Sequence, residues 1–225
     1  MWRALCPDRR LEGRNVLITA GPTREFIDPV RFIGNPSTGK MGWAMARSAW
    51  YRGASVTLVL GPVPPLDVHG FTVIPVVSAE EMKDEVLSRA ESMDVIVKSA
   101  AVGDFRSASF SRDKIKRGDR EELQIDLVQN PDIASLLGER KRPGQILVGF
   151  AAESSDLLEN AVAKMKKKPR LYSGQRHHRP GFGVRRGYQQ GEDPGKEGVS
   201  GEISGTKEDV AEDLWCRILD EAPLS

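Results

Sequence analysis

The sequence predicts an α/β fold of the Rossmann-like, three-layer type, with a mostly parallel sheet between two layers of helices. Short apolar runs alternate along the chain with amphipathic segments of helical period, and this alternation is typical of a parallel sheet covered by helices. Several apolar runs end in small residues, as strands do where a ligand approaches the edge of such a sheet. With 225 residues, the chain is long enough for one large domain with a substantial core.

The first strand–helix–strand unit is predicted between residues 15 and 61. The run NVLITAG, Asn15–Gly21, is apolar and ends in glycine, which is typical of a buried parallel strand. The run SVTLVLG, Ser55–Gly61, has the same character and gives the second strand. Between them, Met41–Gly53 is expected to form a helix that stops at its final glycine. The buried face of this helix would comprise Met41, Ala44, Met45, Ser48 and Ala49.

The remaining elements continue this alternation towards the end of the chain. Their limits follow from the period of the apolar residues and from the turn residues between them. Strands are predicted at Phe71–Val76, Met93–Val102, Glu122–Val128 and Gln145–Ser154. Helices are predicted at Ser78–Ser92, Asn130–Lys141, Asp156–Lys168 and Thr206–Ala222.

Three of these helices have a distinctive end or face. Ser78 followed three residues later by Glu81 predicts a capping box. Asn130 followed by Pro131 predicts a cap with proline in the first turn. The last helix would bury one apolar face, made of Val210, Leu214, Ile218 and Leu219.

The composition argues against several classes of protein. Charged residues make up 29% of the chain and leave a net charge of +1, whereas nucleic-acid and membrane-surface binders carry a clear basic excess. No apolar run approaches the ~20 residues of a membrane span, and the first residues lack the apolar centre of a signal peptide. We therefore expect a cytoplasmic protein, with a lead-in at residues 1–14, a single domain at 15–225 and two reduced thiols, Cys6 and Cys216.

A glycine-rich loop, Gly34–Lys40, has the spacing of a phosphate-binding P-loop up to its lysine. Met41 stands where a P-loop needs Ser or Thr to hold magnesium, and the segment 22–34 separates the loop from its strand. Two interpretations remain open. The loop could bind an anion at the N-terminus of the next helix, or it could simply cap that helix. The residues concerned are Ser37, Thr38, Gly39 and Lys40.

The ends of three predicted strands indicate a shared ligand site. They read TAGPT, SAAVGDF and VGFAAES. Because the carboxyl ends of parallel strands meet at one edge of a sheet, Gly21, Ala100 and Ala101 would let a ligand approach the backbone there. Each end taken alone also fits a tight strand exit without a ligand.

Taken together, these segments resemble the phosphopantothenate–cysteine ligase family. The resemblance runs in order through NVLITAGPTREFIDPVRFIGNPSTGKMG, VKSAAVGDFR, DKIKR, LVQNPDIASLLG, LVGFAAES and ENAVAKMKKK, from Asn15 to Lys168. It implies that the carboxylate of 4'-phosphopantothenate attacks the α-phosphate of CTP and releases pyrophosphate. L-cysteine would then attack the acyl-cytidylate and release CMP. Magnesium would accompany the triphosphate, and the sequence resembles users of CTP more than those of ATP.

The resemblance also implies roles for particular residues. Lys114 would face the triphosphate, and Asp104 would bind the nucleotide or hold magnesium. Asn35 would hydrogen-bond the acyl-cytidylate, with Arg31 close by. The nucleotide base would lie against Phe150 and Ala151, with Lys164 and Lys168 reaching the nucleotide. For the lysines, including Lys114 and Lys116, a solvated charged surface is the simpler alternative.

The glycine loop would then bind a phosphate of the substrate or the intermediate. Pro36 departs from the family, which usually has His or Ser at this position, and proline removes one N–H donor. Family members form dimers, so the segment Phe26–Asn35 could reach a neighbouring subunit. The resemblance does not include the flavin-dependent decarboxylase half of the bifunctional relatives, so a stand-alone or split ligase is expected, with a separate decarboxylase as a candidate partner.

Two other functions are kept as alternatives. An NAD(P)-dependent Rossmann oxidoreductase fits the fold, but the G-x-G-x-x-G fingerprint is missing after the first strand, and Asp67 lies in a proline-rich loop. An inactive remnant of the ligase would explain the unusual segment that follows Lys168.

That segment, Pro169–Gly195, is polar, rich in turn residues and aperiodic, so as written it predicts no strand. The family has a strand here. Codons chosen for Pro169–His178 and read one base later give LDFIVANDI, which is close to that strand. We hypothesise that the segment is out of frame or disordered, which resequencing the gene tests. On this view His177 and His178 are not metal ligands or catalytic bases.

Overall fold

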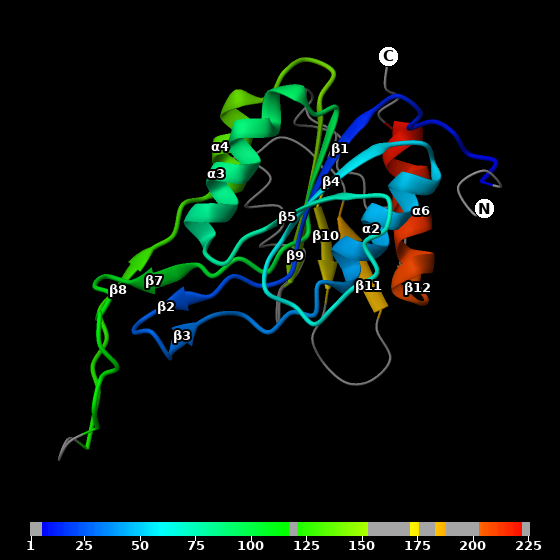
Figure 1. Cartoon of the computed structure of the whole chain (residues 1–225). Coiled ribbons are helices and arrows are strands. Elements are labelled where there is room, and N and C mark those ends of the chain that lie inside the picture. Colours follow the sequence, from blue (N-terminus) through cyan, green and yellow to red (C-terminus); the bar gives the residue numbers. More distant parts are fainter. Residues whose placement is uncertain (1–5, 118–120, 153–171, 176–182, 188–202, 222–225) are drawn as a thin grey trace.

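A computed structural model describes residues 6–117, 121–152, 172–175, 183–187 and 203–221. Its main sheet has eight strands in the order β12-β11-β10-β9-β6-β1-β4-β5 (Figure 1). The strands from β10 to β5 run parallel, and β11 and β12 join as an antiparallel edge. Their bounds are β1 Asn15–Ala20, β4 Ser55–Leu60, β5 Thr72–Pro75, β6 Val95–Lys98, β9 Ile146–Ala152, β10 Tyr172–Gln175, β11 Gly183–Gly187 and β12 Ile203–Ser204.

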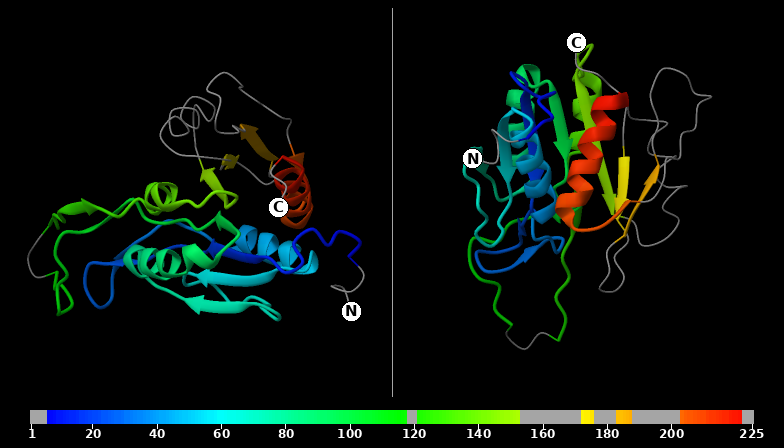
Figure 2. Two further views of the ribbon diagram at one scale, coloured as in Figure 1. Left: turned by 90° about the horizontal axis from the view of Figure 1, so that it is seen from above. Right: turned by 90° about the vertical axis from the view of Figure 1, so that its right-hand side faces the viewer.

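Helices cover both faces of the sheet, which confirms the predicted three-layer α/β fold (Figure 2). Helices α2 (Lys40–Tyr51) and α6 (Lys207–Glu221) pack on one face, and α3 (Ala79–Arg89) and α4 (Ile133–Arg140) pack on the other. Successive residues of a strand point to opposite faces. In β1, Val16 and Ile18 accordingly join the core beneath α2 and α6, while Leu17 joins the core beneath α3 and α4.

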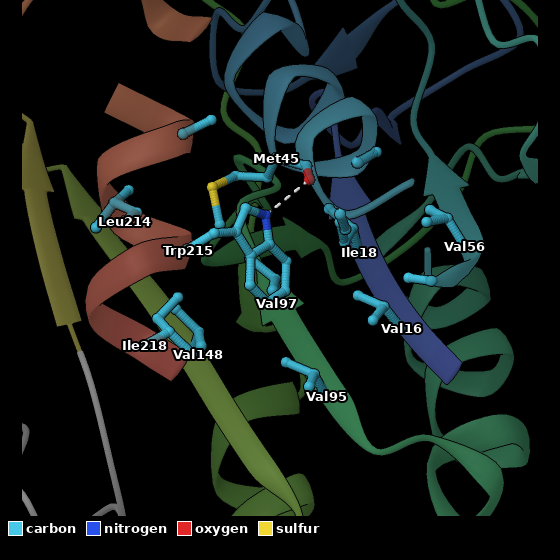
Figure 3. Close-up of a cluster of buried hydrophobic side chains, with 14 of the residues drawn as sticks. Val16, Ile18, Met45, Val56, Val95, Val97, Val148, Leu214, Trp215 and Ile218 are labelled. Atoms are coloured by element: carbon cyan, nitrogen blue, oxygen red, sulfur yellow. Dashed lines mark hydrogen bonds between the residues drawn. The ribbon is translucent and has the colours of Figure 1, made fainter. Parts of the chain in front are cut away.

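Helices α2 and α6 lie side by side on the sheet and share one core (Figure 3). All five residues predicted for the inner face of α2 are buried, and so are the four predicted for α6. Trp215 is fully buried between the helices, and its indole N–H donates a 2.9 Å hydrogen bond to the carbonyl oxygen of Met45. The sequence pattern thus predicted both helices, but not the indole that joins them.

Two small antiparallel sheets lie outside the main sheet, at the lower left of Figure 1. Strands β2 (Glu25–Phe26) and β3 (Phe32–Ile33) form one, and β7 (Phe105–Ser107) and β8 (Leu127–Gln129) form the other. Residues 108–117 and 121–126, between β7 and β8, extend away from the body and are called the arm here (Figure 1). The turn between β2 and β3 carries Arg31, and the arm carries Lys114.

Two local predictions about this region are wrong. The alternating run Glu122–Val128 does not form a strand of the main sheet, because only its last two residues enter β8, which pairs with β7. Asn130 does not cap α4. Asp132 does, by accepting a 3.1 Å hydrogen bond from the N–H of Ser135. The side chain of Asn130 instead donates to the carbonyl oxygen of Gly103.

At α3 the predicted cap is confirmed. The hydroxyl of Ser78 accepts from the N–H of Glu81 at 3.2 Å. The Glu81 carboxylate reaches back to the N–H of Val77, one residue earlier than a standard capping box. A short 3₁₀ turn, Ala90–Ser92, follows the helix and leads into β6.

The segment after Lys168 does contain strands, contrary to the prediction that it would contain none. Strand β10 pairs parallel with β9, and β11 pairs antiparallel with β10. All of the rest of Pro169–Gly195 lies outside the described residues, including His177 and His178. The predicted helix Asp156–Lys168, with Lys164 and Lys168, also lies outside them. The out-of-frame hypothesis therefore stays a prediction.

Residues before Asn15 pack against the domain. Leu11 is fully buried in the core beneath α2 and α6, and its N–H donates to the carbonyl oxygen of Arg52 at 3.2 Å. Asp8 and Arg52 form an ion pair of 2.9 Å. Cys6 and Cys216 are free thiols, as predicted. Within the described ranges, no helix has both the length and the apolar character needed to cross a membrane.

Candidate functional site

The carboxyl ends of β1 and β6 are joined into one rim by backbone hydrogen bonds. The N–H of Ala101 donates to the carbonyl oxygen of Gly21 at 2.8 Å, and the N–H of Thr23 donates back to Ala101 at 3.4 Å. The buried hydroxyl of Thr23 accepts from the N–H of Gly103 at 2.9 Å. Two of the small-residue strand ends predicted to share a site are therefore in direct contact.

The glycine loop is attached to this rim through Asn35. The side-chain amide of Asn35 donates a 3.1 Å hydrogen bond to the carbonyl oxygen of Val102, next to the small residues of the β6 end. The far end of the loop also approaches β1, because a Cβ atom on Gly39 would lie 3.4 Å from the backbone nitrogen of Gly21. The loop therefore lies along the rim, with Asn35 exposed on it.

The start of α2 favours an anion over a plain helix cap. The N-cap residue is Gly39, in the left-handed conformation with φ of 70°, and it has no side chain with which to cap. The hydroxyl of Ser37 accepts from the N–H of Gly39, at 3.3 Å, rather than from the first turn of α2. Thr38 and Lys40 are exposed. Because the first N–H groups of a helix carry partial positive charge, this end suits an anion such as a phosphate.

A second lysine lies near the same end of α2. Burial and the neighbouring positive charge of Lys40 lower the pKa of Lys207, the first residue of α6, and Glu208 opposes that effect. The two helices pack side by side, so the first residues of both bring positive charge to one edge of the fold. Lys207 was not among the predicted site residues, because a lysine at a helix start gives no sign of its distant neighbour.

Arg31 and Lys114 belong to segments that contact each other. The guanidinium of Arg31 donates to the carboxylate of Asp28 at 3.0 Å and to the carbonyl oxygen of Ile115 at 3.0 Å. The N–H of Ile115 also donates to Asp28, at 3.1 Å. The residue next to Lys114 is thus tied to the turn that carries Arg31, while Lys114 itself is exposed.

The electrostatics of this contact centre on Asp28, whose side chain is fully buried. Burial alone would raise the pKa of the carboxyl group. Hydrogen bonds from the N–H groups of Val30, Ile115 and Arg31, together with the charge of Arg31, outweigh burial and lower the pKa. Asp28 is therefore a carboxylate at neutral pH. Asp28 was not among the site residues predicted from the sequence.

The remaining predicted residues lie near the rim or are described only in part. Asp104 is an exposed carboxylate after β6, and its carbonyl oxygen accepts from the N–H of Asn130 at 2.9 Å. Phe150, in β9, is partly buried against the core beneath α2 and α6. Ala151 is in the same strand, and only its backbone is described. Among the described residues, no group of three or more His, Cys, Asp or Glu side chains could hold a metal ion.

Comparison with known proteins identifies the family of the chain. Residues 11–220 match the family described as "DNA/pantothenate metabolism flavoprotein C-terminal domain". The coenzyme A biosynthesis bifunctional protein CoaBC of Vibrio vulnificus is 44% identical over 173 residues, which cover 73% of this chain and 42% of the relative. The chain thus spans less than half the length of this curated relative.

Solved structures show which part of the relatives is matched. The crystal structure of the C-terminal domain of CoaBC aligns with a TM-score of 0.76 and 33% identity, covering 95% of this chain and 97% of that one. A Cab2 mutant in complex with phosphopantothenate-cysteine has the same fold, with a TM-score of 0.72 at 17% identity, over 98% of this chain and 90% of that one. The chain therefore belongs to the family of the DNA/pantothenate metabolism flavoprotein C-terminal domain, to which it matches over residues 11–220.

Proposed function

We propose that the chain is the ligase domain of coenzyme A biosynthesis and joins 4'-phosphopantothenate to L-cysteine through an acyl-cytidylate made from CTP. The observation that carries this proposal is the attachment of the glycine loop to the β6 rim through Asn35 and Val102. That contact places an exposed amide beside small residues that leave the backbone accessible. Membership of the family of the CoaBC C-terminal domain supports the choice of substrates.

In the first step a carboxylate oxygen of 4'-phosphopantothenate forms a bond to the α-phosphorus of CTP, and the bond to pyrophosphate breaks. Negative charge gathers on the phosphoryl oxygens during this exchange, and fixed cations and N–H groups stabilise it. Lys114 and Arg31 supply cations on two joined segments. The N-terminus of α2, with Lys40 and Lys207 near it, supplies a place for a phosphate of the substrate.

In the second step the amine of cysteine attacks the acyl carbonyl, the carbon–oxygen bond to the cytidylate breaks, and CMP leaves as the amine loses a proton. The carbonyl oxygen becomes negative on the way, so a hydrogen-bond donor beside it lowers the barrier. Asn35 is an exposed side chain whose amide nitrogen donates to Val102. An amide has two N–H groups, so one can hold the rim while the other faces the intermediate.

Magnesium would enter this reaction with the triphosphate. Mg²⁺ is commonly held by one or two carboxylates together with substrate phosphates. The exposed carboxylate of Asp104, beside the β6 end, can supply one oxygen ligand. When bound, the ion would neutralise charge on the phosphates. The backbone bond from Asn130 keeps the residue in place at the rim.

The active form would be a homodimer. Nine large hydrophobic side chains are exposed in the described chain, and eight of them lie in segments 26–32, 105–110 and 123–128, on the small sheets and the arm. An apolar surface gathered in one region is typical of a protein–protein contact. With a net charge of +1, the chain lacks the basic excess of a nucleic-acid or membrane-surface binder. Members of the family form dimers, so a second copy of the chain is the proposed partner. The eight side chains are Phe26, Val30, Phe32, Phe105, Phe110, Leu123, Leu127 and Val128.

Nucleotide-dependent thermal stability tests the function directly. A ligand at a hundred times its Kd stabilises the folded state by about 2.7 kcal/mol, which is roughly 5–10 °C for a chain of this size. We expect that shift from CTP with Mg²⁺ and not from NAD. A shift with NAD alone would support the oxidoreductase, and no shift with either nucleotide would support the inactive remnant.

A further inference from the structure

One buried carboxylate joins the turn between β2 and β3 to the arm. Oδ1 of Asp28 accepts from the N–H groups of Val30 and Arg31, each at 2.8 Å. Oδ2 accepts from the guanidinium of Arg31 at 3.0 Å and from the N–H of Ile115 at 3.1 Å. The two oxygens therefore differ in role. Oδ1 shapes the turn, and Oδ2 attaches the turn to the arm.

The arm is attached on both sides of Lys114. On one side the N–H of Ser111 donates to the carbonyl oxygen of Ile27 at 2.9 Å. On the other, Ile115 donates to Asp28 and accepts from Arg31 at 3.0 Å. The side chain of Lys114 is exposed and takes no part in these bonds. Its backbone is thus fixed while its ammonium group is left for another partner.

We propose that Asp28 is a positioning residue for the ligase reaction, which holds the Lys114 segment of the arm at a fixed place relative to Arg31. The inference rests on the proposed function, since it assumes that Lys114 acts on the triphosphate. A cation held in place before the substrate binds loses less freedom when it engages the phosphates than a cation on a loose loop. Residues that orient metal ligands from behind change metal affinity or activity 10–100-fold when mutated, and we expect an effect of that size here.

The substitution Asp28→Asn separates the two roles of the carboxylate. With the amide oxygen at the Oδ1 position, the bonds to Val30 and Arg31 of the turn remain. The amide NH₂ then takes the Oδ2 position and faces two donors, the N–H of Ile115 and the Arg31 guanidinium. The variant should therefore keep its fold and weaken the attachment of the arm at Ile115. Asp126→Asn is the matched control, because Asp126 is an exposed carboxylate of the same arm.

Kinetics of pyrophosphate release test the link to Lys114. We expect Asp28→Asn to lower kcat 10–100-fold and Asp126→Asn to leave it unchanged. Because Asp28 acts through the Lys114 segment, the double variant with Lys114→Ala should be no slower than Lys114→Ala alone. Losses that multiply in the double variant would overturn the proposal.

Hydrogen exchange of the backbone tests the attachment without any substrate. We expect the N–H of Ile115, which loses its acceptor, to exchange at least tenfold faster in Asp28→Asn than in the wild type or in Asp126→Asn. Equal exchange in all three proteins would overturn the proposal even in an active enzyme. A wild-type chain that released no pyrophosphate would instead overturn the proposed function, and with it the positioning role, while faster exchange would still report the attachment.

Discussion

The side-chain amide of Asn35 lies 3.1 Å from the carbonyl oxygen of Val102 and donates a hydrogen bond to it. This bond joins the glycine loop to the strand end that carries Ala100 and Ala101. The loop follows β3, and the strand end follows β6, far along the chain. The bond therefore assembles the candidate site from two distant parts of the sequence.

Asn35→Asp should remove activity and leave the fold intact. A carboxylate cannot donate to Val102, and its charge would oppose the negative charge that develops on the acyl carbonyl. We expect cysteine-dependent CMP release to fall by at least about 10²-fold, as when one donor to a developing oxyanion is lost. Asn15→Asp makes the same amide-to-acid change at an exposed amide that donates to the carbonyl oxygen of Ser92, at the amino end of β1 and away from the rim, and it should leave activity unchanged. A fully active Asn35→Asp enzyme would contradict the role of Asn35.

Lys40→Met should raise the pKa of Lys207. Burial lowers that pKa first, and the charge of Lys40 lowers it further, so removing the charge leaves burial and the opposing charge of Glu208. NMR titration of ¹³C-labelled lysine side chains measures the change. The same variant should bind 4'-phosphopantothenate more weakly, because one cation near the start of α2 is lost. An unchanged Lys207 titration would mean that the two lysines do not interact in solution.

Trp215→Phe should destabilise the core that α2 and α6 share. The indole is fully buried and donates to Met45, so the variant loses a buried hydrogen bond, at a cost of roughly 1–3 kcal/mol. Trp215→Ala should cost about 3–5 kcal/mol through the cavity it leaves. Urea denaturation measures both values. Trp43→Phe, at a partly exposed indole, should cost less, and an equal loss would argue against the buried bond.

Acid should weaken the contact of the N-terminal segment with α2. The Arg10 guanidinium lowers the pKa of Asp8 to about 2, from an ordinary value of 3.8, against the opposing effect of burial, and Arg52 helps. A carboxyl group whose folded-state pKa is depressed stabilises the fold above its unfolded pKa and loses that contribution as pH falls towards its folded pKa. Asp8→Asn should therefore be less stable than wild type at pH 7, with a gap that closes between about pH 4 and pH 2. Urea midpoints across this range provide the measurement. A gap that does not change with pH would contradict the assignment.

Phe32→Glu should separate the proposed dimer. Phe32 is 46% exposed and packs edge-on against Phe26, with ring centroids 5.6 Å apart. A charge at this place would have to be buried in a dimer contact and would oppose it. Light scattering coupled to gel filtration should give a dimer for the wild type and a monomer for the variant, with equal circular dichroism. A monomeric wild type would show that these side chains are exposed for another reason.

Periodic patterns predicted the parts of the fold that local physics determines. The buried faces of α2 and α6 follow from the helical period alone, because every third or fourth residue must face the sheet. The same reliance on local period gave the wrong prediction for the run Glu122–Val128. Its alternation fits a strand, but the chain there belongs to an arm, where tertiary placement overrides the local pattern.

The site could be predicted only where the sequence itself carries the chemistry. Small strand ends and the glycine loop are visible in the sequence, and the resemblance pointed to Asn35 and Arg31. Asp28 and Lys207 were missed because their roles come from Ile115 and Lys40, residues far away along the chain. Asn130 was misassigned as a cap because Asp132, two residues later, is an equally good one.

Release of pyrophosphate before cysteine is added is the decisive test for an acyl-cytidylate intermediate. The purified chain is mixed with CTP, Mg²⁺ and 4'-phosphopantothenate, and pyrophosphate is measured with cysteine absent. We expect a burst of pyrophosphate that requires 4'-phosphopantothenate and is lost in Lys114→Ala. CMP release should follow when cysteine is added. Pyrophosphate that forms without 4'-phosphopantothenate, or only after cysteine is present, would contradict an acyl-cytidylate held at the rim.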